Sequence, residues 1–157
     1  MTCLNPRMAP VVLIRMAEFF HTKRLELIAK LFSMLNVAIF GIEVSPRVEI
    51  EGGLFLPHTV GTVIGAAFIG ANCTIMQGVT LGAIESDLSF TVTKRPVIGR
   101  DVLIGSGAKV LGGITVGDHV KIGANAVVLC DVPAYAVAVG VPARVILTER
   151  LGANNAD

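Results

Sequence analysis

The chain has no tryptophan, one tyrosine and only three cysteines among its 157 residues, and its formal net charge is +1. A charge this close to neutral gives no electrostatic reason to expect a nucleic-acid partner. Cys3, Cys73 and Cys130 form no CxxC motif and are odd in number, which is typical of a reducing compartment rather than of a disulfide framework. We therefore expect a cytoplasmic protein.

The chain also lacks long apolar runs. Residues 1–10 do not combine a charged start, an apolar stretch and a small-residue cleavage site, so no signal peptide is expected. The apolar stretch over residues 11–14 is short, and the one over residues 31–40 is interrupted by Ser33 and Asn36. Neither approaches the ~18 residues needed to span a bilayer, so no transmembrane helix is predicted.

A six-residue repeat takes up much of what remains. Aliphatic residues, four of them followed by glycine, recur at Ile98, Ile104, Val110, Val116, Ile122 and Val128, and an earlier frame holds Val63, Ile69, Ile75 and Leu81. This period is far from the 3.6 of a helix but is a multiple of the strand period of 2. It predicts a mainly β fold, a parallel β-helix of triangular cross-section with about 18 residues per coil and inward aliphatic side chains. We expect the glycines to adopt corner dihedrals that a Cβ disfavours.

The repeat divides the chain into parts. Residues 1–41 are expected to form an N-terminal helical segment, because apolar residues recur there at helical spacing. Residues 42–146 are expected to form the β-helix, and residues 147–157 a C-terminal tail. Over residues 82–96 a polar loop replaces the repeat, and a loop of this length in a compact domain is usually functional. One repeat, starting at Ile64, is a residue short, which predicts a local bulge.

The helical segment has two interpretations. It packs on the open end of the prism or on a partner subunit, or it makes peripheral membrane contact, because cationic residues lie beside Phe and Leu. A mean hydropathy of +0.72 exceeds what one slim prism needs to bury. We interpret the excess as subunit interface, which predicts a homotrimer.

Three segments carry a resemblance to a known family. They are residues 77–82 (Gln-Gly-Val-Thr-Leu-Gly), residues 104–112 (Ile-Gly-Ser-Gly-Ala-Lys-Val-Leu-Gly) and residues 139–144 (Val-Gly-Val-Pro-Ala-Arg). They resemble the serine acetyltransferase branch of the hexapeptide-repeat acyltransferases, and the similarity runs over most of the chain. The resemblance implies a left-handed coil, an exception to the right-handed rule for parallel crossovers. It also implies acetyl-CoA as donor and a homotrimer with active sites between neighbouring subunits.

His58 is the candidate catalytic base. Imidazole is suited to take a proton near pH 7 from an acceptor hydroxyl that attacks a thioester. Residues 54–58 resemble the family segment that carries the catalytic histidine, and Glu43, almost one coil upstream, stands where the family places an aspartate partnered with it. Glu43 would then orient His58, as the carboxylate of a hydrolase triad does. A backbone N–H, for which Gly82 is the candidate, would hold the oxyanion.

The other histidines, His21 and His119, are expected to be structural or solvent-exposed. Carbonic anhydrases built on the same coil use three histidine ligands, two of them close in sequence. The three histidines of this chain are widely separated, so we expect no metal site.

The resemblance also assigns candidate CoA contacts. Ser106 and Ala124 are equivalent residues one coil apart. In related enzymes, the backbone groups at these two positions line the slot for the pantetheine arm. Small residues there also simply satisfy the repeat, and both interpretations can hold together. Lys109 and Arg144 are candidates for the CoA phosphates, because cations pair with phosphate oxygens. Cys130 stands where relatives often carry a lysine near those phosphates, which predicts weaker CoA binding or a substitute cation.

The acceptor side departs from the family pattern. Relatives that acetylate serine carry an aspartate immediately before the catalytic histidine and a second histidine before the proline that restarts the repeat. Here Pro57 and Arg95 occupy these places, and Lys94 makes the loop more basic. Such a loop suits an acceptor bearing hydroxyls or negative charge, so we expect a sugar of a surface polysaccharide or its precursor. The alternative is L-serine, and with it a role in cysteine biosynthesis.

A further interpretation belongs to a different class of protein. The chain could be a non-catalytic trimeric β-helix that serves as a binding module, since solenoid faces are good docking surfaces. His58, Glu43 and Arg144 at family positions favour the enzyme, whereas loss of the second histidine, of the aspartate before His58 and of the tail lysine favours the module. We expect an acetyl-CoA-dependent O-acetyltransferase.

Overall fold

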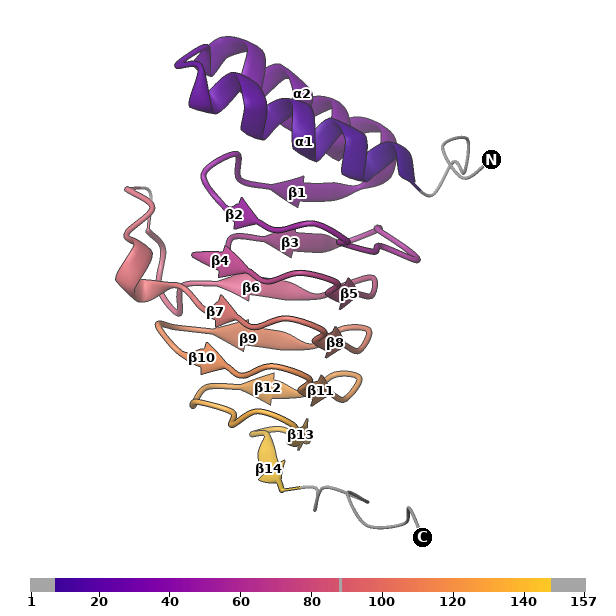
Figure 1. Ribbon diagram of the computed structural model, residues 1–157, viewed down its shortest axis with the longest axis vertical. Helices are drawn as coiled ribbons and strands as arrows, with labels where there is room; N and C mark the ends of the chain where they lie inside the picture. Colours follow the sequence, from indigo (N-terminus) through magenta and orange to yellow (C-terminus); the bar gives the residue numbers. More distant parts are fainter. Residues whose placement is uncertain (1–7, 88, 148–157) are drawn as a thin grey trace, which may run out of the picture.

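The computed structural model describes residues 8–87 and 89–147. The protein is a left-handed parallel β-helix, a triangular prism capped at its N-terminal end by two helices, with one loop projecting from its side (Figure 1). The fold expected from the six-residue period is confirmed. Cys3, the expected absence of a signal peptide and the C-terminal tail from residue 148 onward concern parts of the chain outside the described residues.

Three sheets of short strands form the sides of the prism. The first holds β1 (Ile42–Val44), β3 (Thr62–Ile64), β6 (Thr80–Gly82), β9 (Lys109–Leu111) and β12 (Val127–Val128). The second holds β2 (Glu49–Ile50), β4 (Phe68–Ile69), β7 (Val97–Ile98) and β10 (Thr115–Val116). The third holds β5 (Thr74–Ile75), β8 (Leu103–Ile104), β11 (Lys121–Ile122), β13 (Val137–Val139) and β14 (Arg144–Ile146).

Neighbouring strands are parallel except for β13 and β14, which pair antiparallel. The chain therefore turns back on itself at its C-terminal end, and the regular coil ends before residue 146, where the sequence had placed the end of the β-helix. The projecting loop joins β6 to β7 and contains a short 3-10 helix, η2 (Val92–Lys94). Gly82 belongs to β6 rather than to the loop.

Two helices cover the N-terminal end of the prism (Figure 1). Helix α1 (Ala9–Thr22) has a proline in its first turn, and α2 (Glu26–Phe40) ends at Gly41, which adopts φ +64°. Glycine suits this left-handed C-cap because it has no Cβ. The hydroxyl of Ser33 in α2 donates to the carbonyl of Val44 in β1 at 3.3 Å, which fixes the side of α2 that faces the prism.

The side of α2 opposite Ser33 is apolar. By helical spacing this side carries Leu27, Ile28, Leu31, Leu35 and Ile39, all of which are exposed. Among the described residues, no helix is long and apolar enough to cross a membrane. Both interpretations of the helical segment, contact with a partner subunit and contact with a membrane surface, stay predictions.

Glycines in the Ile-Gly and Val-Gly pairs have a different role from the one expected. The φ angles of Gly99, Gly105, Gly117 and Gly123 are not left-handed. The left-handed corner residues are instead Asn72, Asp101, His119, Asn125 and Tyr135, with φ of +54° to +64°, together with Gly78 and Gly107, with φ of +71° and +72°. A Cβ on Gly105 would lie 2.6 Å from the amide nitrogen of Ala124 on the next coil, and one on Gly117 would lie 2.5 Å from that of Ala134. These glycines are required because successive coils approach too closely there for any side chain.

The core is a set of stacked aliphatic columns. Ile75, Ile104 and Ile122 lie in register in β5, β8 and β11 and are at most 1% exposed. Cys73 is fully buried in the slot where a small inward residue was expected.

We expect Ile122→Ala to lower the free energy of unfolding by about 2–5 kcal/mol, because it leaves a cavity between Ile104 and Ala138, its buried neighbours on the adjacent coils. Chemical denaturation measures this change. The matched control is Lys121→Ala in the same strand, whose exposed side chain should contribute no more than about 0.5 kcal/mol. Equal losses in the two variants would contradict the inward stacking.

Candidate active site

His58 lies at the corner between the third sheet and β3. This corner is held by the hydroxyl of Thr59, which donates to the carbonyl of Phe40 at 2.7 Å, and by the amide of Gly61, which donates to the carbonyl of Gly41 at 2.9 Å. The imidazole is exposed and makes no hydrogen bond or ion pair with any described residue. It borders an open hollow of about 320 Å³ whose other lining residues are Pro10, Phe40, Leu56, Pro57, Thr59 and Val60. His58 is therefore accessible to a substrate.

Glu43 lies on the coil before His58. It points outward from β1, in register with Val63 of β3. The structure gives no hydrogen bond between the side chains of His58 and Glu43 among the described residues. Glu43 instead borders a second hollow of about 410 Å³, shared with Lys30 and Ser33 of α2. The two residues are thus brought onto adjacent coils without contact, and their catalytic pairing stays a prediction.

The candidate CoA slot is a corner built of small residues. The amide of Asn125 donates to the carbonyl of Ser106 at 2.8 Å, so Ser106 and Ala124 lie on successive coils at the same corner. Ser106 is half-buried and Ala124 is exposed. Gly82 pairs with Leu111, and a Cβ on Gly82 would meet nothing within 4 Å, so the outer side of this strand is open.

The cations expected near CoA differ in their availability. The ammonium of Lys109 donates to the carbonyl of Gly78 on the preceding coil, so this side chain lies along the prism. Arg144, in β14, is exposed and has no hydrogen-bond or ion-pair partner in the described part of the chain. Cys130 is an exposed free thiol. Of the two candidates, Arg144 is the one free to meet a phosphate.

The loop between β6 and β7 carries the acceptor candidates, and Arg95 is not free to serve as one. Its side chain is only 10% exposed and forms an ion pair with Asp87, Nη2 to Oδ2, at 3.2 Å. Its Nη1 donates to the carbonyl of Gly65 at 2.9 Å. Lys94 is exposed and Pro57 is half-buried. The expectation that both cations of the loop face an acceptor therefore needs revision, because Arg95 points into the base of the loop.

Asp87 is the partner of Arg95, and the sequence interpretation did not single it out. Hydrogen bonds from the Ser89 hydroxyl first, and then from the amide and hydroxyl of Thr91 and from Arg95, lower the pKa of Asp87 to about 2. The carboxylate stays ionised at all ordinary pH values. An aspartate a few residues before the arginine that closes a polar loop is the signal that could have identified this pair.

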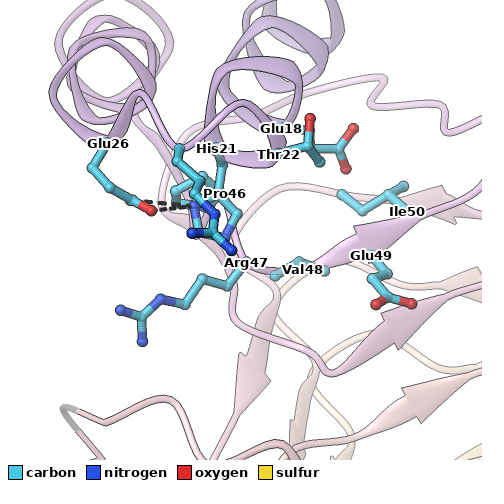
Figure 2. A pocket seen from close by; sticks show the side chains of 10 residues that line it. Glu18, His21, Thr22, Glu26, Pro46, Arg47, Val48, Glu49 and Ile50 are labelled. Carbon is cyan, nitrogen blue, oxygen red and sulfur yellow. Dashed lines mark hydrogen bonds and ion pairs between the residues drawn. The ribbon is translucent and has the colours of Figure 1, made fainter.

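Another hollow, of about 590 Å³, lies between the α1–α2 turn and the turn before β2 (Figure 2). At its rim, Nδ1 of His21 lies 3.0 Å from Oε1 of Glu26. Burial raises the pKa of the Glu18 carboxyl in its wall. Arg47 points away from the hollow, and its Nη1 donates to the carbonyl of Ser89 in the projecting loop at 3.1 Å. The predicted catalytic and CoA-binding residues do not line this hollow.

The remaining histidine, His119, stacks on Tyr135 with ring centroids 4.7 Å apart, and its Nδ1 lies 3.8 Å from Oδ2 of Asp101. Within the described residues, no cluster of three His, Cys, Asp or Glu side chains could hold a metal ion.

Comparison with known proteins identifies the family of proteins that this chain resembles. Residues 95–130 match a family model described as bacterial transferase hexapeptide (six repeats), and residues 61–83 match one described as hexapeptide repeat of succinyl-transferase. The serine acetyltransferase of Helicobacter pylori (strain ATCC 700392 / 26695) is 45% identical over 148 residues, covering 94% of this chain and 85% of that protein.

Solved structures agree with the sequence relatives. Neisseria gonorrhoeae serine acetyltransferase in complex with serine superposes with a TM-score of 0.79 at 31% identity, covering 89% of this chain and 56% of that chain. A serine acetyltransferase in complex with CoA superposes with a TM-score of 0.78 at 34% identity, covering 87% of this chain and 55% of that chain. This chain therefore spans little more than half the length of these solved chains.

Thiol chemistry should separate the two described cysteines. Burial raises the pKa of the Cys73 thiol, so less of the reactive thiolate forms at pH 8, and the side chain is also inaccessible. We expect iodoacetamide to alkylate Cys130 in the native protein and Cys73 only after denaturation. Peptide mass spectrometry measures both sites, and equal alkylation of both in the native state would contradict the buried position of Cys73.

Proposed function

Because the chain belongs to the serine acetyltransferases, a family of O-acetyltransferases, we propose that it transfers the acetyl group of acetyl-CoA to the hydroxyl of L-serine. The observation that carries this proposal is the exposed His58 at an open corner, in a chain that matches a serine acetyltransferase along nearly its whole length. The sugar acceptor favoured by the sequence has no support among these relatives, and L-serine, the alternative, fits them better. A place in polysaccharide biosynthesis is likewise unsupported.

The proposed chemistry needs one residue that first accepts a proton and later returns it. The acceptor hydroxyl attacks the thioester carbonyl while His58 takes its proton. A C–O bond forms, an oxyanion develops, and a backbone N–H on the open side of β6 stabilises it, with Gly82 as the candidate. The C–S bond then breaks, and His58 returns the proton to the CoA thiolate. Glu43 would orient the imidazole and stabilise its charged form.

Acetyl-CoA is the proposed co-substrate. The small residues Ser106 and Ala124 leave room along their corner for the pantetheine arm. Arg144 is the cation we propose for the CoA phosphates, since it is exposed and unpaired among the described residues, whereas Lys109 is held by Gly78. Cys130 lacks the ammonium that a lysine at this position would supply.

We also propose that the active site forms between subunits of a homotrimer. His58 and Lys94 lie near opposite ends of the strands of the first sheet, because His58 precedes β3 whereas Lys94 follows β6. A three-residue strand spans ~10 Å, so one chain keeps the two side chains apart. A neighbouring chain that docks along this sheet can supply the loop that faces His58. The cytoplasmic location stays a prediction from the cysteine pattern.

The catalytic role of His58 has a direct kinetic test. We expect His58→Asn to lower kcat by about 10²–10⁴-fold, the usual contribution of a positioned acid–base group. Release of the CoA thiol measures turnover. His21→Asn and His119→Asn serve as matched controls and should keep nearly full activity, because neither side chain lies near the candidate site. A His58→Asn enzyme with wild-type turnover would exclude this mechanism.

The acceptor is tested by thiol release from acetyl-CoA with L-serine and, in parallel, with a panel of sugars and nucleotide-sugars. We expect release with L-serine only, and we expect it to be lost in His58→Asn. Release only with a sugar would overturn the proposed acceptor. No release with any acceptor, together with no thermal stabilisation by CoA, would favour the non-catalytic binding module, because a ligand of the folded state must raise its stability.

A further inference from the structure

The loop between β6 and β7 is folded around one buried guanidinium. Arg95 donates from Nη1 to the carbonyl of Gly65, and from Nη2 to both the carbonyl and the side chain of Asp87 at 3.0 and 3.2 Å. The side chains of Arg95 and Asp87 are only 10% and 6% exposed. Gly65 stands at the corner where the repeat is one residue short. The irregular corner and the arginine that closes the loop are therefore parts of one contact.

Phe90 provides a second attachment. The guanidinium carbon of Arg95 lies over the Phe90 ring, 3.9 Å from the ring centroid. The guanidinium carbon of Arg47 lies 6.0 Å from the same centroid. The ring is partly buried against the hydrophobic core, and Phe90 adopts φ +57°. A bulky residue in this region costs energy, so the surrounding contacts must hold it there. Arg47 and Arg95 are the cations that do so.

Two glycines of β9's corner provide the third attachment. A Cβ on Gly113 would overlap the carbonyl oxygen of Thr93, and a Cβ on Gly112 would lie 3.2 Å from the Cδ1 atom of Ile84. Both ends of the loop therefore rest on backbone that carries no side chain. Because Gly113 has no left-handed φ, an alanine there would disturb only the loop.

The attached loop borders a hollow of about 360 Å³, and two residues of opposite charge line this hollow. Lys94 and Glu85 both line it, together with Gly112 and Gly113. Both charged side chains are exposed, and neither has a hydrogen-bond or ion-pair partner among the described residues. A cation and an anion that line one hollow match the carboxylate and the ammonium of a free amino acid.

We propose that Arg95 is a positioning residue for the acceptor, acting through Asp87, Phe90 and Gly65 to hold the loop that presents Lys94 and Glu85. This inference rests on the proposed function, because it takes L-serine as the acceptor. Arg95 does not touch the acceptor; Lys94 meets its carboxylate and Glu85 its ammonium. The loss of the acidic residue before His58, where this chain has Pro57, is then compensated from the loop.

The test weakens the attachment of the loop at Arg95 and at Gly113, and it measures both the amide hydrogen exchange of the loop and the KM for L-serine. Arg95→Met removes the guanidinium, Arg95→Lys keeps the charge but not the planar stacking, and Gly113→Ala pushes on Thr93 from below. Amide hydrogen exchange of residues 84–94 reports the loop without any need for activity. We expect faster exchange and a KM for L-serine raised about tenfold, equivalent to 1.4 kcal/mol, in Arg95→Met and Gly113→Ala. Arg95→Lys should be intermediate, and the KM for acetyl-CoA should stay within about twofold of wild type.

The matched control is Arg100→Met, which removes an exposed arginine paired with Asp118 at 3.1 Å on the same prism. It should change neither readout. Faster loop exchange with an unchanged KM for L-serine would overturn the positioning role, and unchanged exchange would overturn the attachment itself. Equal rises in both KM values would indicate a general structural loss and would also overturn it. A wild-type enzyme that never acetylates L-serine would instead refute the proposed function and the positioning with it, while the exchange data would still decide the attachment.

Discussion

Close approach of successive coils is the constraint on which the rest of this structure depends. At the corners occupied by Gly99, Gly105 and Gly117, the backbone of one coil lies so near the next that a Cβ would come within 3 Å of it. That approach brings the strands into register and stacks Ile75, Ile104 and Ile122 into a continuous column. Hydrophobic burial supplies the driving force, but the glycines set the spacing at which burial becomes continuous.

A prism built this way has little freedom for chemistry on its sides. Every strand edge except those of the end coils is paired, and inward positions are filled with aliphatic side chains. Functional groups must therefore stand at corners, on outward positions or on excursions from the coil. His58 occupies a corner, Glu43 an outward position and Lys94 an excursion. His58 and Lys94 lie at opposite ends of the strands of the first sheet, and this separation is the physical reason for which we propose a site completed by a neighbouring chain.

The projecting loop is attached to the prism mainly by polar contacts. It buries little apolar surface, apart from Phe90, and relies on a guanidinium with several partners. Buried ion pairs contribute stability only where hydrogen bonds satisfy both groups. Asp87 accepts from Ser89, Thr91 and Arg95, so its charge is well compensated. The same network withdraws Arg95 from solvent and leaves Lys94 as the exposed cation of the loop.

The sequence by itself determined the β-helix, its helical cap, the position of the projecting loop and His58 as the candidate base. The first three follow from a strict period, from helical spacing and from the interruption of the repeat, all of which are properties of neighbouring residues, whereas His58 follows from the resemblance of residues 54–58 to a family segment. Only the tertiary structure decided the directions of long side chains. Arg95 turns inward because the carbonyl of Gly65 and the carboxylate of Asp87 both accept hydrogen bonds from its guanidinium. Lys109 lies along the prism because the carbonyl of Gly78 sits on the coil beside it. The repeat glycines proved to serve coil spacing rather than corner dihedrals for the same reason, since the atoms they avoid belong to the next coil.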